Sequence, residues 1–280
     1  MICQDFLPSP PLRDYVKCYH LRHFTFADAA SIPFKPYAPR PDQQLAFYPR
    51  GHELVEHIGN HRLLERPRSM ITGQYIERTN RHLRGPDFVA LLVDFQPGML
   101  YRITGIPFYE LTNTFVDAEA VFSTEIRLVN ERLNSTDDYQ EMIAIVELFL
   151  RQLIQGIKRD SHPLDIITSF LIEQPENSSI IQLAEDTCLC PRQFERRFNQ
   201  RMGVPPKLFS RIARLNKAYR LKYSTPSNDW LSVALACGYY DYQHLAKDFQ
   251  RFAGVTPAAY LAEDANAPER LFGLSDSSYA

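Results

Sequence analysis

Two short stretches of the chain repeat one pattern of residue types. The sequence QFERRFNQRMGVPP begins at Gln193, and HLAKDFQRFAGVTP begins at His244. Each has a large apolar residue at its second position, a basic residue at its fourth and phenylalanine at its sixth, and each closes on Gly-Val-x-Pro. Basic and amide side chains presented on a short helix are the groups that bind guanine and adenine edges in the major groove. The repeat therefore raises nucleic-acid recognition as a candidate chemistry.

The first copy predicts two short helices joined by a tight turn. Ser179 and Gln182 fit a capping box before IIQLAEDT, Pro191 suits the first position of the next helix, and Gly203 suits its C-terminal cap. In that second helix Phe194 and its neighbours four residues apart share one side, which predicts a buried face. The opposite, outward side carries Arg192, Glu195, Arg196 and Asn199. This arrangement is typical of a helix-turn-helix motif.

The second copy predicts the same motif. Asp229 is a candidate N-cap for WLSVALAC, Gly238 supplies the turn, and Asp241 can cap the following helix. Leu245, Phe249 and Phe252 share the inward side. The outward side carries Gln243, Lys247 and Gln250, with Tyr242 and His244 near the helix start.

A long basic helix is expected between the two copies, over PPKLFSRIARLNKAYRLKY. From residue 191 to residue 222 ten lysines and arginines stand against one acid, Glu195. Such a run is the footprint of a surface that faces phosphates, or else it is a solvated helical face. Arg197 and Arg201 lie close to the buried side, which favours structural ion pairs for them.

Residues 162–262 resemble the DNA-binding domain of the AraC/XylS family of bacterial transcription regulators. The resemblance rests on LAEDTCLCPRQFERRFNQRMGVPP, on RIARLNKAYRL and on VALACGYYDYQHLAKDFQRFAGVTPAAY. It implies a transcription regulator, an activator as most members are, with RNA polymerase as a partner and a small-molecule effector. Two residues depart from the pattern, since Cys188 replaces the usual glycine and Cys190 the usual serine N-cap. The DNA-binding residues that follow are Arg192, Glu195, Arg196, Asn199, Tyr242, Gln243, His244, Lys247, Gln250 and Arg251.

Two linked recognition helices can enter major-groove segments about one turn, roughly 34 Å, apart on one face of double-stranded DNA. One chain can then read an asymmetric site. We expect Arg196 to contact guanine, Gln243 adenine and Glu195 cytosine, while Lys247 reads guanine or binds phosphate. The charges of the linking helix would hold the phosphate backbone without reading sequence.

The rest of the chain predicts an α+β fold, with a β-rich N-terminal part before the all-helical part. The runs QQLAFYP, SMITGQYIERT and DFVALLVDF read as strands of a cupin-like barrel or sandwich, and FQPGMLYRITGIPFYELTN resembles part of one sensor subgroup of the family. We expect a sensor domain over residues 1–120, a bracing or homodimerising helical segment over 121–158, the DNA-binding domain over 162–262, and a loose polar tail over 263–280. No motif identifies the residues of an effector site.

Other chemistries find little support. Cys188 and Cys190 lack a second ligand pair for zinc. His52, His57 and His61 are not on one strand face, so we interpret them as surface histidines, and we expect no metal, no cofactor and no catalytic residue. Five cysteines, no secretory signal and no apolar run long enough for a bilayer indicate a cytoplasmic protein with reduced thiols.

Two alternatives stay open. The N-terminal part could be a protein-interaction module of a DNA-binding protein. It could also be a metal-dependent enzyme fused to a DNA-binding domain.

Overall fold

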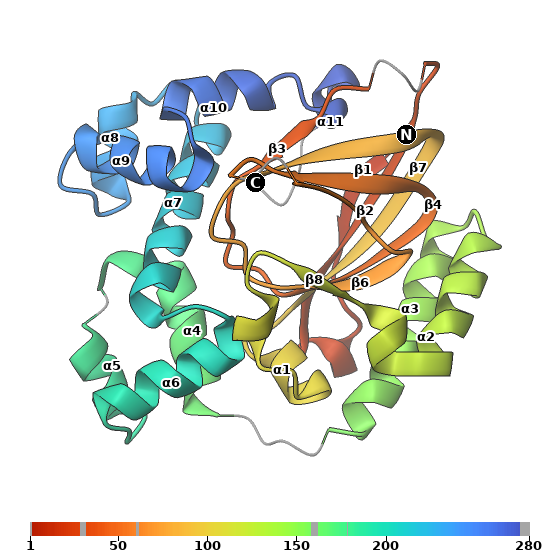
Figure 1. The fold of residues 1–280 in the computed structure, drawn as a ribbon, viewed down its shortest axis with the longest axis horizontal. Coiled ribbons are helices and arrows are strands. Elements are labelled where there is room, and N and C mark those ends of the chain that lie inside the picture. The colour runs from red at the N-terminus through yellow and green to blue at the C-terminus, as the bar shows by residue number, and fades with distance from the viewer. Residues whose placement is uncertain (1, 29–31, 60–61, 158–161, 178, 275–280) are drawn as a thin grey trace.

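A computed structural model describes residues 2–28, 32–59, 62–157, 162–177 and 179–274 of the chain. Its strands lie between Ile2 and Asp117, and helices alone make up the part from Pro163 onward (Figure 1). The predicted α+β fold, a β-rich part followed by a helical part, is confirmed.

The N-terminal part is built on one antiparallel sheet. Its order is β1-β2-β7-β4-β6-β8, with β3 paired to β7 and β5 paired to β4. The eight described strands are β1 (Ile2–Phe6), β2 (Val16–Thr25), β3 (Lys35–Tyr37), β4 (Gln44–His57), β5 (Arg62–Glu65), β6 (Ser69–Thr72), β7 (Thr79–Phe95) and β8 (Phe115–Asp117). Short 3-10 turns lie at Pro10–Leu12 (η1), Phe108–Leu111 (η2) and Pro175–Asn177 (η3).

The two longest strands extend past the ends that the sequence predicts. Pro49 and Gly51 suggest a stop, yet β4 continues to His57 because its pairing with β7 shifts register on both sides of Arg50. Gly51 adopts the left-handed conformation there, with φ of 68°. A bulge of this kind lets a strand bend and continue, so a glycine inside it is no boundary.

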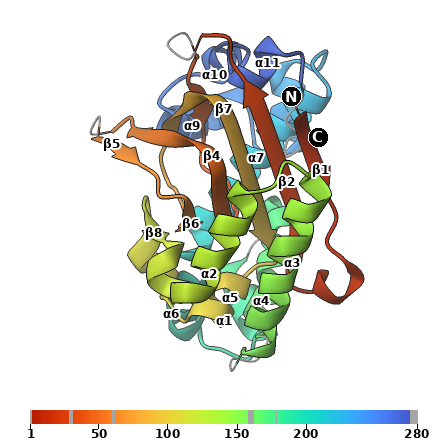
Figure 2. The same ribbon diagram turned by 90° about the vertical axis from the view of Figure 1, so that its right-hand side faces the viewer.

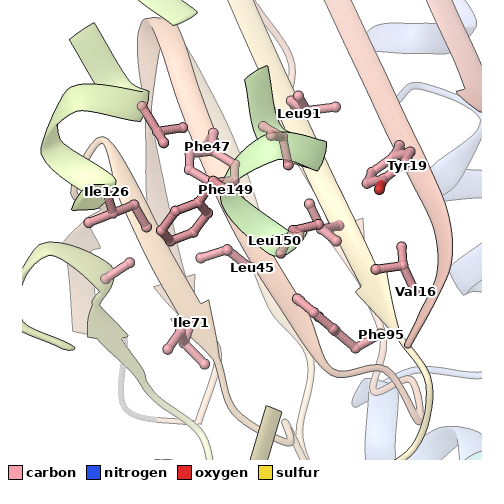
Figure 3. Close-up of a cluster of buried hydrophobic side chains, with 14 of the residues drawn as sticks. Val16, Tyr19, Leu45, Phe47, Ile71, Leu91, Phe95, Ile126, Phe149 and Leu150 are labelled. Atoms are coloured by element: carbon pink, nitrogen blue, oxygen red, sulfur yellow. The ribbon is translucent and has the colours of Figure 1, made fainter. Parts of the chain in front are cut away.

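Alternation along the strands gives the sheet two different faces. Leu45, Phe47 and Leu91 point to one face, where helices α2 (Ala118–Asn134) and α3 (Tyr139–Gln155) cover them (Figure 2). Figure 3 shows Ile126 of α2 and Phe149 of α3 packed among these side chains. The alternate residues point to the other face, which is partly polar and encloses a cavity. The short helix α1 (Met99–Thr104) follows β7.

The helical part contains both predicted helix-turn-helix motifs. Helix α4 (Pro163–Glu173) precedes the first, which consists of α5 (Ile180–Asp186) and α6 (Pro191–Met202). The linking helix is α7 (Pro206–Ser224), and the second motif consists of α8 (Trp230–Ala236) and α9 (Tyr242–Ala253). Helices α10 (Pro257–Asp264) and α11 (Pro268–Leu271) follow.

The cores of the two motifs are formed by the residues that the repeat predicts. Phe194 and Phe198 of α6 pack with Phe209 of α7, whereas Leu245 and Phe249 of α9 pack at the other end of α7. The described residues include no helix that is both long and apolar enough to cross a membrane.

The expectation of a loose tail is wrong for the residues up to Leu274. Instead of ending in solvent, α10 and α11 lead the chain back to the sheet, where Glu269 is buried and Phe272 packs on Phe24. A glutamate in a polar stretch predicts an exposed side chain. Glu269 is buried instead because it forms an ion pair with Lys35, which is far away in the sequence. Residues 275–280 lie outside the described residues.

One interpretation of the histidines is also wrong. His52 is exposed, as expected, but His57 is buried against the ring of Tyr75. Burial lowers the pKa of His57, which favours its neutral form. His61 lies outside the described residues.

Candidate nucleic-acid interface and ligand cavity

Helix α6 presents a polar face at its N-terminal end. Pro191 opens the helix and Gly203 closes it with φ of 86°, as the sequence predicts. Phe194 and Phe198 are fully buried, so the residues on the opposite side of the helix face outward. The side chains of Arg192, Glu195 and Arg196 are exposed, and Asn199 is half-buried.

Helix α9 presents the corresponding face of the second motif. The Asp241 carboxylate caps the helix by accepting a hydrogen bond from the His244 amide at 2.8 Å. Tyr242 is half-buried, and Gln250 donates to the Gly254 carbonyl at 2.8 Å, which engages that amide within the helix end. The exposed candidates on α9 are Gln243, His244, Lys247, Gln250 and Arg251.

Several of these exposed cations have no partner among the residues that the structure describes. Within the described ranges, the side chains of Arg196, Lys247 and Arg251 make no hydrogen bond and no ion pair. A cation without an intramolecular partner keeps its full charge and all its donors for a ligand. Both recognition helices therefore offer donors that nothing within the described chain satisfies.

The charges of α7 behave differently, because most of them pair inside the domain. Arg211 binds Asp248 at 2.7 Å, Arg214 lies over the Tyr239 ring, and Lys217 binds Glu176 at 3.0 Å. Lys222 donates to the Asn228 carbonyl at 2.6 Å. These four residues therefore help to join α7 to its neighbours, and the expectation that the charges of α7 also hold phosphates stays a prediction.

The two turns differ in one backbone position. Gly238 in the second turn has φ of 74°, and Cys188 has φ of 54° at the matching place in the first. The left-handed region strains any residue with a Cβ atom. Cys190, which stands at the N-cap of α6, makes no side-chain hydrogen bond to the helix. Both departures noted in the sequence thus weaken the first motif.

Sequence reasoning missed one aromatic residue beside α9. Tyr240 is 85% exposed, and its ring lies 6.1 Å from the ring of His244. An exposed tyrosine next to a recognition helix can contact the sugar-phosphate backbone. The sequence could have indicated this residue. Tyr239 fills the core position after the turn, so the tyrosine that follows it directly is expected to point outward.

The first motif is fixed to the sheet by a cluster around Gln43. The side-chain amide of Gln43 donates to the Arg201 carbonyl at 2.7 Å, and its oxygen accepts from the Gly98 amide at 3.2 Å. The Arg201 guanidinium in turn donates to both Asp165 oxygens, at 2.9 and 2.8 Å. A Cβ atom on Gly98 would lie 2.1 Å from Asp165 Oδ1, so only glycine fits. The predicted structural ion pair of Arg201 is confirmed.

The second motif is fixed to the sheet through Tyr260 of α10. Its hydroxyl donates to the Pro36 carbonyl at 3.2 Å and accepts from the Ala38 amide at 2.9 Å. Glu263 of the same helix pairs with Arg78. Both motifs therefore contact the N-terminal part.

The second face of the sheet encloses a cavity of about 60 Å³. Apolar side chains such as Phe24, Leu83 and Phe88 line part of it. The charged lining consists of four permanent cations, Arg22, Lys35, Arg40 and Arg81, and two carboxylates, Glu53 and Glu269. Room for a few waters, apolar walls and an excess of cations suit a small organic anion better than a cation.

Two arginines near this cavity, Arg81 and Arg66, interact with an aromatic ring and with a buried carboxylate, respectively. The Arg81 guanidinium lies 3.3 Å from the centre of the Tyr37 ring, and among the described residues its buried Nε has no hydrogen-bond partner. Arg66 pairs with Glu53, which also accepts from the Tyr48 hydroxyl at 3.1 Å. Glu53 is therefore already neutralised.

His20 also lines the cavity, where two carboxylates compensate its positive charge. Its ring nitrogens lie 2.7 Å from Asp5 and 3.0 Å from Asp94. Burial alone lowers the pKa of His20, but the hydrogen bonds to these two carboxylates raise it to about 9. Cys18 completes a group with Asp5 and His20 whose ligand atoms lie within 4.8 Å of one another and could hold a metal. Sequence reasoning missed this group because its members meet only through pairing of β1 with β2.

Comparison with known proteins supports both parts of the chain separately. Residues 183–263 match a helix-turn-helix domain family, and residues 4–117 match a domain of unknown function (DUF6597). The chain is 31% identical over 141 residues to the HTH-type transcriptional regulator ArgR of Pseudomonas aeruginosa, which covers 45% of this chain and 42% of the relative. It is 35% identical over 92 residues to an uncharacterized HTH-type transcriptional regulator of Haemophilus influenzae, and this match covers 32% of this chain and 30% of the relative.

The chain thus spans less than half the length of these curated relatives. In fold it is similar to the apo form of a ToxT point variant from Vibrio cholerae, with a TM-score of 0.50, 11% sequence identity, and coverage of 88% of this chain and 97% of that one. This likeness concerns the two-part fold alone. From the duplicated motif and these matches together, we conclude that the chain carries a C-terminal helix-turn-helix domain of the AraC type.

Proposed function

We propose that this protein is a sequence-specific regulator of transcription that binds double-stranded DNA through α6 and α9. The observation that carries the proposal is the pair of exposed helix faces with cations that have no partner within the described residues. Helix α7, which links the two motifs, has 19 residues and is therefore about 28 Å long, since an α-helix rises 1.5 Å per residue. That length is close to one turn of DNA, roughly 34 Å.

The residues have distinct roles in this proposal. Arg196 contacts guanine, Gln243 adenine and Glu195 cytosine, whereas Lys247 binds guanine or phosphate. Arg251 and Tyr240 hold the backbone beside the second motif. The remaining candidates, Arg192, Asn199, Tyr242, His244 and Gln250, complete the surface around these contacts.

The N-terminal part acts as the sensor in this proposal. The charged cavity supports a small-molecule effector, and the contacts of Gln43 and Tyr260 give the effector a route to both motifs. Binding shifts a pre-existing equilibrium in how the two parts are arranged. We propose a sensor over residues 1–120, a bracing or dimerising segment over 121–158 and a DNA-binding domain over 162–262. The protein then activates transcription together with RNA polymerase.

The proposal is tested by selecting bound sites from random double-stranded DNA with the full chain. We expect an enriched site with two readable clusters about 10 base pairs apart. Enrichment of no sequence, with binding that only fades as salt rises, would contradict sequence-specific regulation and leave a nonspecific DNA-binding protein.

A further inference from the structure

The segment that follows the DNA-binding part reaches the cavity of the sensor part. Glu269 of α11 is 2% exposed, and its Oε1 lies 2.5 Å from Lys35 Nζ, on β3. Both residues line the cavity. The chain therefore places one of its own carboxylates, from a point far away in sequence, on a cation of the sheet's second face.

An aromatic ring accompanies this carboxylate. The Phe272 ring stacks on Phe24 with centres 6.0 Å apart and lies 5.6 Å from the ring of Phe26. Leu274 packs against the same apolar cluster. Glu269 thus lines the cavity, and Phe272 packs on Phe24, one of its apolar lining residues. The segment brings an acid and an aromatic ring together here, as an aromatic carboxylic acid would.

The lining of the cavity carries more cations than carboxylates, so the carboxylate of Glu269 compensates part of its positive charge. Of the two carboxylates in the lining, Glu53 is already bound by Arg66 and by Tyr48. Glu269 is thus the carboxylate of the lining that pairs with Lys35. Removing one member of a buried ion pair is costly, because the remaining charge loses that compensation. Any departure of Glu269 therefore favours the entry of another anion beside Lys35.

The segment is also tied to the second recognition helix. Arg270 of α11 binds Asp264 at 2.9 Å and lies over the Tyr223 ring of α7. In α10 the Tyr260 ring packs 6.0 Å from Phe249 of α9, while its hydroxyl donates to the carbonyl of Pro36 in β3, the strand that also carries Lys35. Displacing the segment from the cavity would therefore disturb the support of α9.

We propose that Pro268–Leu274 is an internal ligand of the sensor cavity, which a small carboxylate with an apolar ring displaces by taking the places of Glu269 and Phe272. This inference rests on the proposed sensor function and adds to it the chemical class of effector and the competitor that it meets. The segment holds α10 against β3 while the cavity is empty of effector, and its release frees α10 and α9 to change their position relative to the sheet.

The test uses the full chain and 3-phenylpropanoate as the probe, with 3-phenylpropan-1-ol as its uncharged counterpart. A segment that occupies the cavity most of the time leaves only a fraction of the molecules free to bind the carboxylate. The apparent affinity for the carboxylate is reduced in proportion to that fraction. We expect Glu269→Gln and Phe272→Ala, singly and together, to bind the carboxylate about tenfold tighter than the wild type, as measured by titration calorimetry. Leu271→Ala, on the same helix but 60% exposed, is the matched control and should bind as the wild type does.

A second readout needs no variant. In the wild type, saturating 3-phenylpropanoate should speed amide hydrogen exchange over residues 268–274 at least severalfold, and the alcohol should not. The proposal is overturned if the variants bind the carboxylate no tighter than the wild type, if they do not bind it at all, or if exchange in the segment is unchanged at saturation. None of these measurements involves DNA, so failure of the proposed DNA-binding function would appear only in the site selection.

Discussion

At the scale of single residues, the recognition faces depend on side chains that have no partner in the described part of the chain. The buried side of α6 and α9 is fixed by phenylalanines, which forces Arg196 and Lys247 outward. Arg211 and Lys217, one helix away, pair with Asp248 and Glu176. Charge density along the sequence does not distinguish these two groups of cations, but their partners in the fold do.

Replacing Arg196 or Lys247 with alanine tests the assignment of the recognition faces. Each change should weaken binding to the selected site by about 1–3 kcal/mol and relax the sequence preference in one cluster only. Fluorescence anisotropy with the selected site and with sites altered in each cluster measures both effects. Arg132→Ala, an exposed arginine on α2, removes the same charge and should leave both unchanged. Equal losses on all DNA sequences would reduce either residue to a phosphate contact.

His20 gives the protein a dependence of stability on pH. Its pKa in the folded state is about 9, above the ordinary value of 6.5, because the carboxylates of Asp5 and Asp94 outweigh burial. A raised pKa stabilises the fold fully below about pH 6.5, and this contribution disappears as pH rises through about 9. We expect the free energy of unfolding in urea to fall by about 3 kcal/mol across that window. His20→Asn should remove this fall, and a slope that persists in the variant would assign it to another group.

At the scale of elements, the first helix-turn-helix carries two weak points that the second lacks. Cys188 takes a left-handed conformation that favours glycine, and Cys190 leaves the N-terminus of α6 without a side-chain cap. In the second motif Gly238 and Asp241 fill the matching places, and the Asp241 carboxylate does cap α9. The first recognition helix is therefore the less firmly held of the two.

Restoring the usual residues should stabilise the first motif. Cys188→Gly relieves the backbone strain and Cys190→Ser supplies a cap, and each should raise the free energy of unfolding by roughly 0.5–1 kcal/mol. Urea denaturation of the full chain measures the gain. The reverse change in the second motif, Gly238→Cys, should destabilise, because its Cβ would lie 2.4 Å from Glu176 Cβ. Stabilisation by the reverse change would contradict the equivalence of the two turns.

Elements with strong local signals could be predicted from the sequence, and elements set by pairing could not. The helices around Pro191, Asp229 and Asp241 begin where the sequence predicts, because proline and cap residues act within one turn. The cavity could not be predicted, since its lining joins β2, β3, β4 and β7 with α11 through strand register. The buried place of Glu269 was hidden for the same reason, because a glutamate among polar residues reads as exposed unless its lysine partner is known.

At the scale of the whole molecule, the two parts are held together at both ends of α7. Gln43 donates to the Arg201 carbonyl and lies 3.7 Å from the Met202 sulfur, whereas Tyr260 makes two hydrogen bonds to the backbone around β3. Hydrogen bonds of this kind contribute about 1 kcal/mol each. Both motifs therefore contact the N-terminal part directly, so an effector that changes the sheet can alter the position of either motif.

Loosening this contact should separate the unfolding of the two parts. We expect one cooperative calorimetric transition in the wild type and two in the double variant Gln43→Ala, Tyr260→Phe, which loses the hydrogen bonds of both side chains across the contact. Tyr240→Phe, which removes an exposed hydroxyl, should keep the single transition. Two transitions already present in the wild type would show that the parts unfold independently.

The central claim is that one chain carries two recognition helices at a fixed separation. The most direct measurement is the affinity of the full chain for its selected site after about five base pairs, half a helical turn, are inserted between the two clusters, which turns them to opposite faces of the duplex. The rigid linking helix predicts that the affinity falls to that of a site with one cluster destroyed, as measured by anisotropy at constant salt. An affinity that does not change with the insertion would contradict a pair of helices held at a fixed separation by α7.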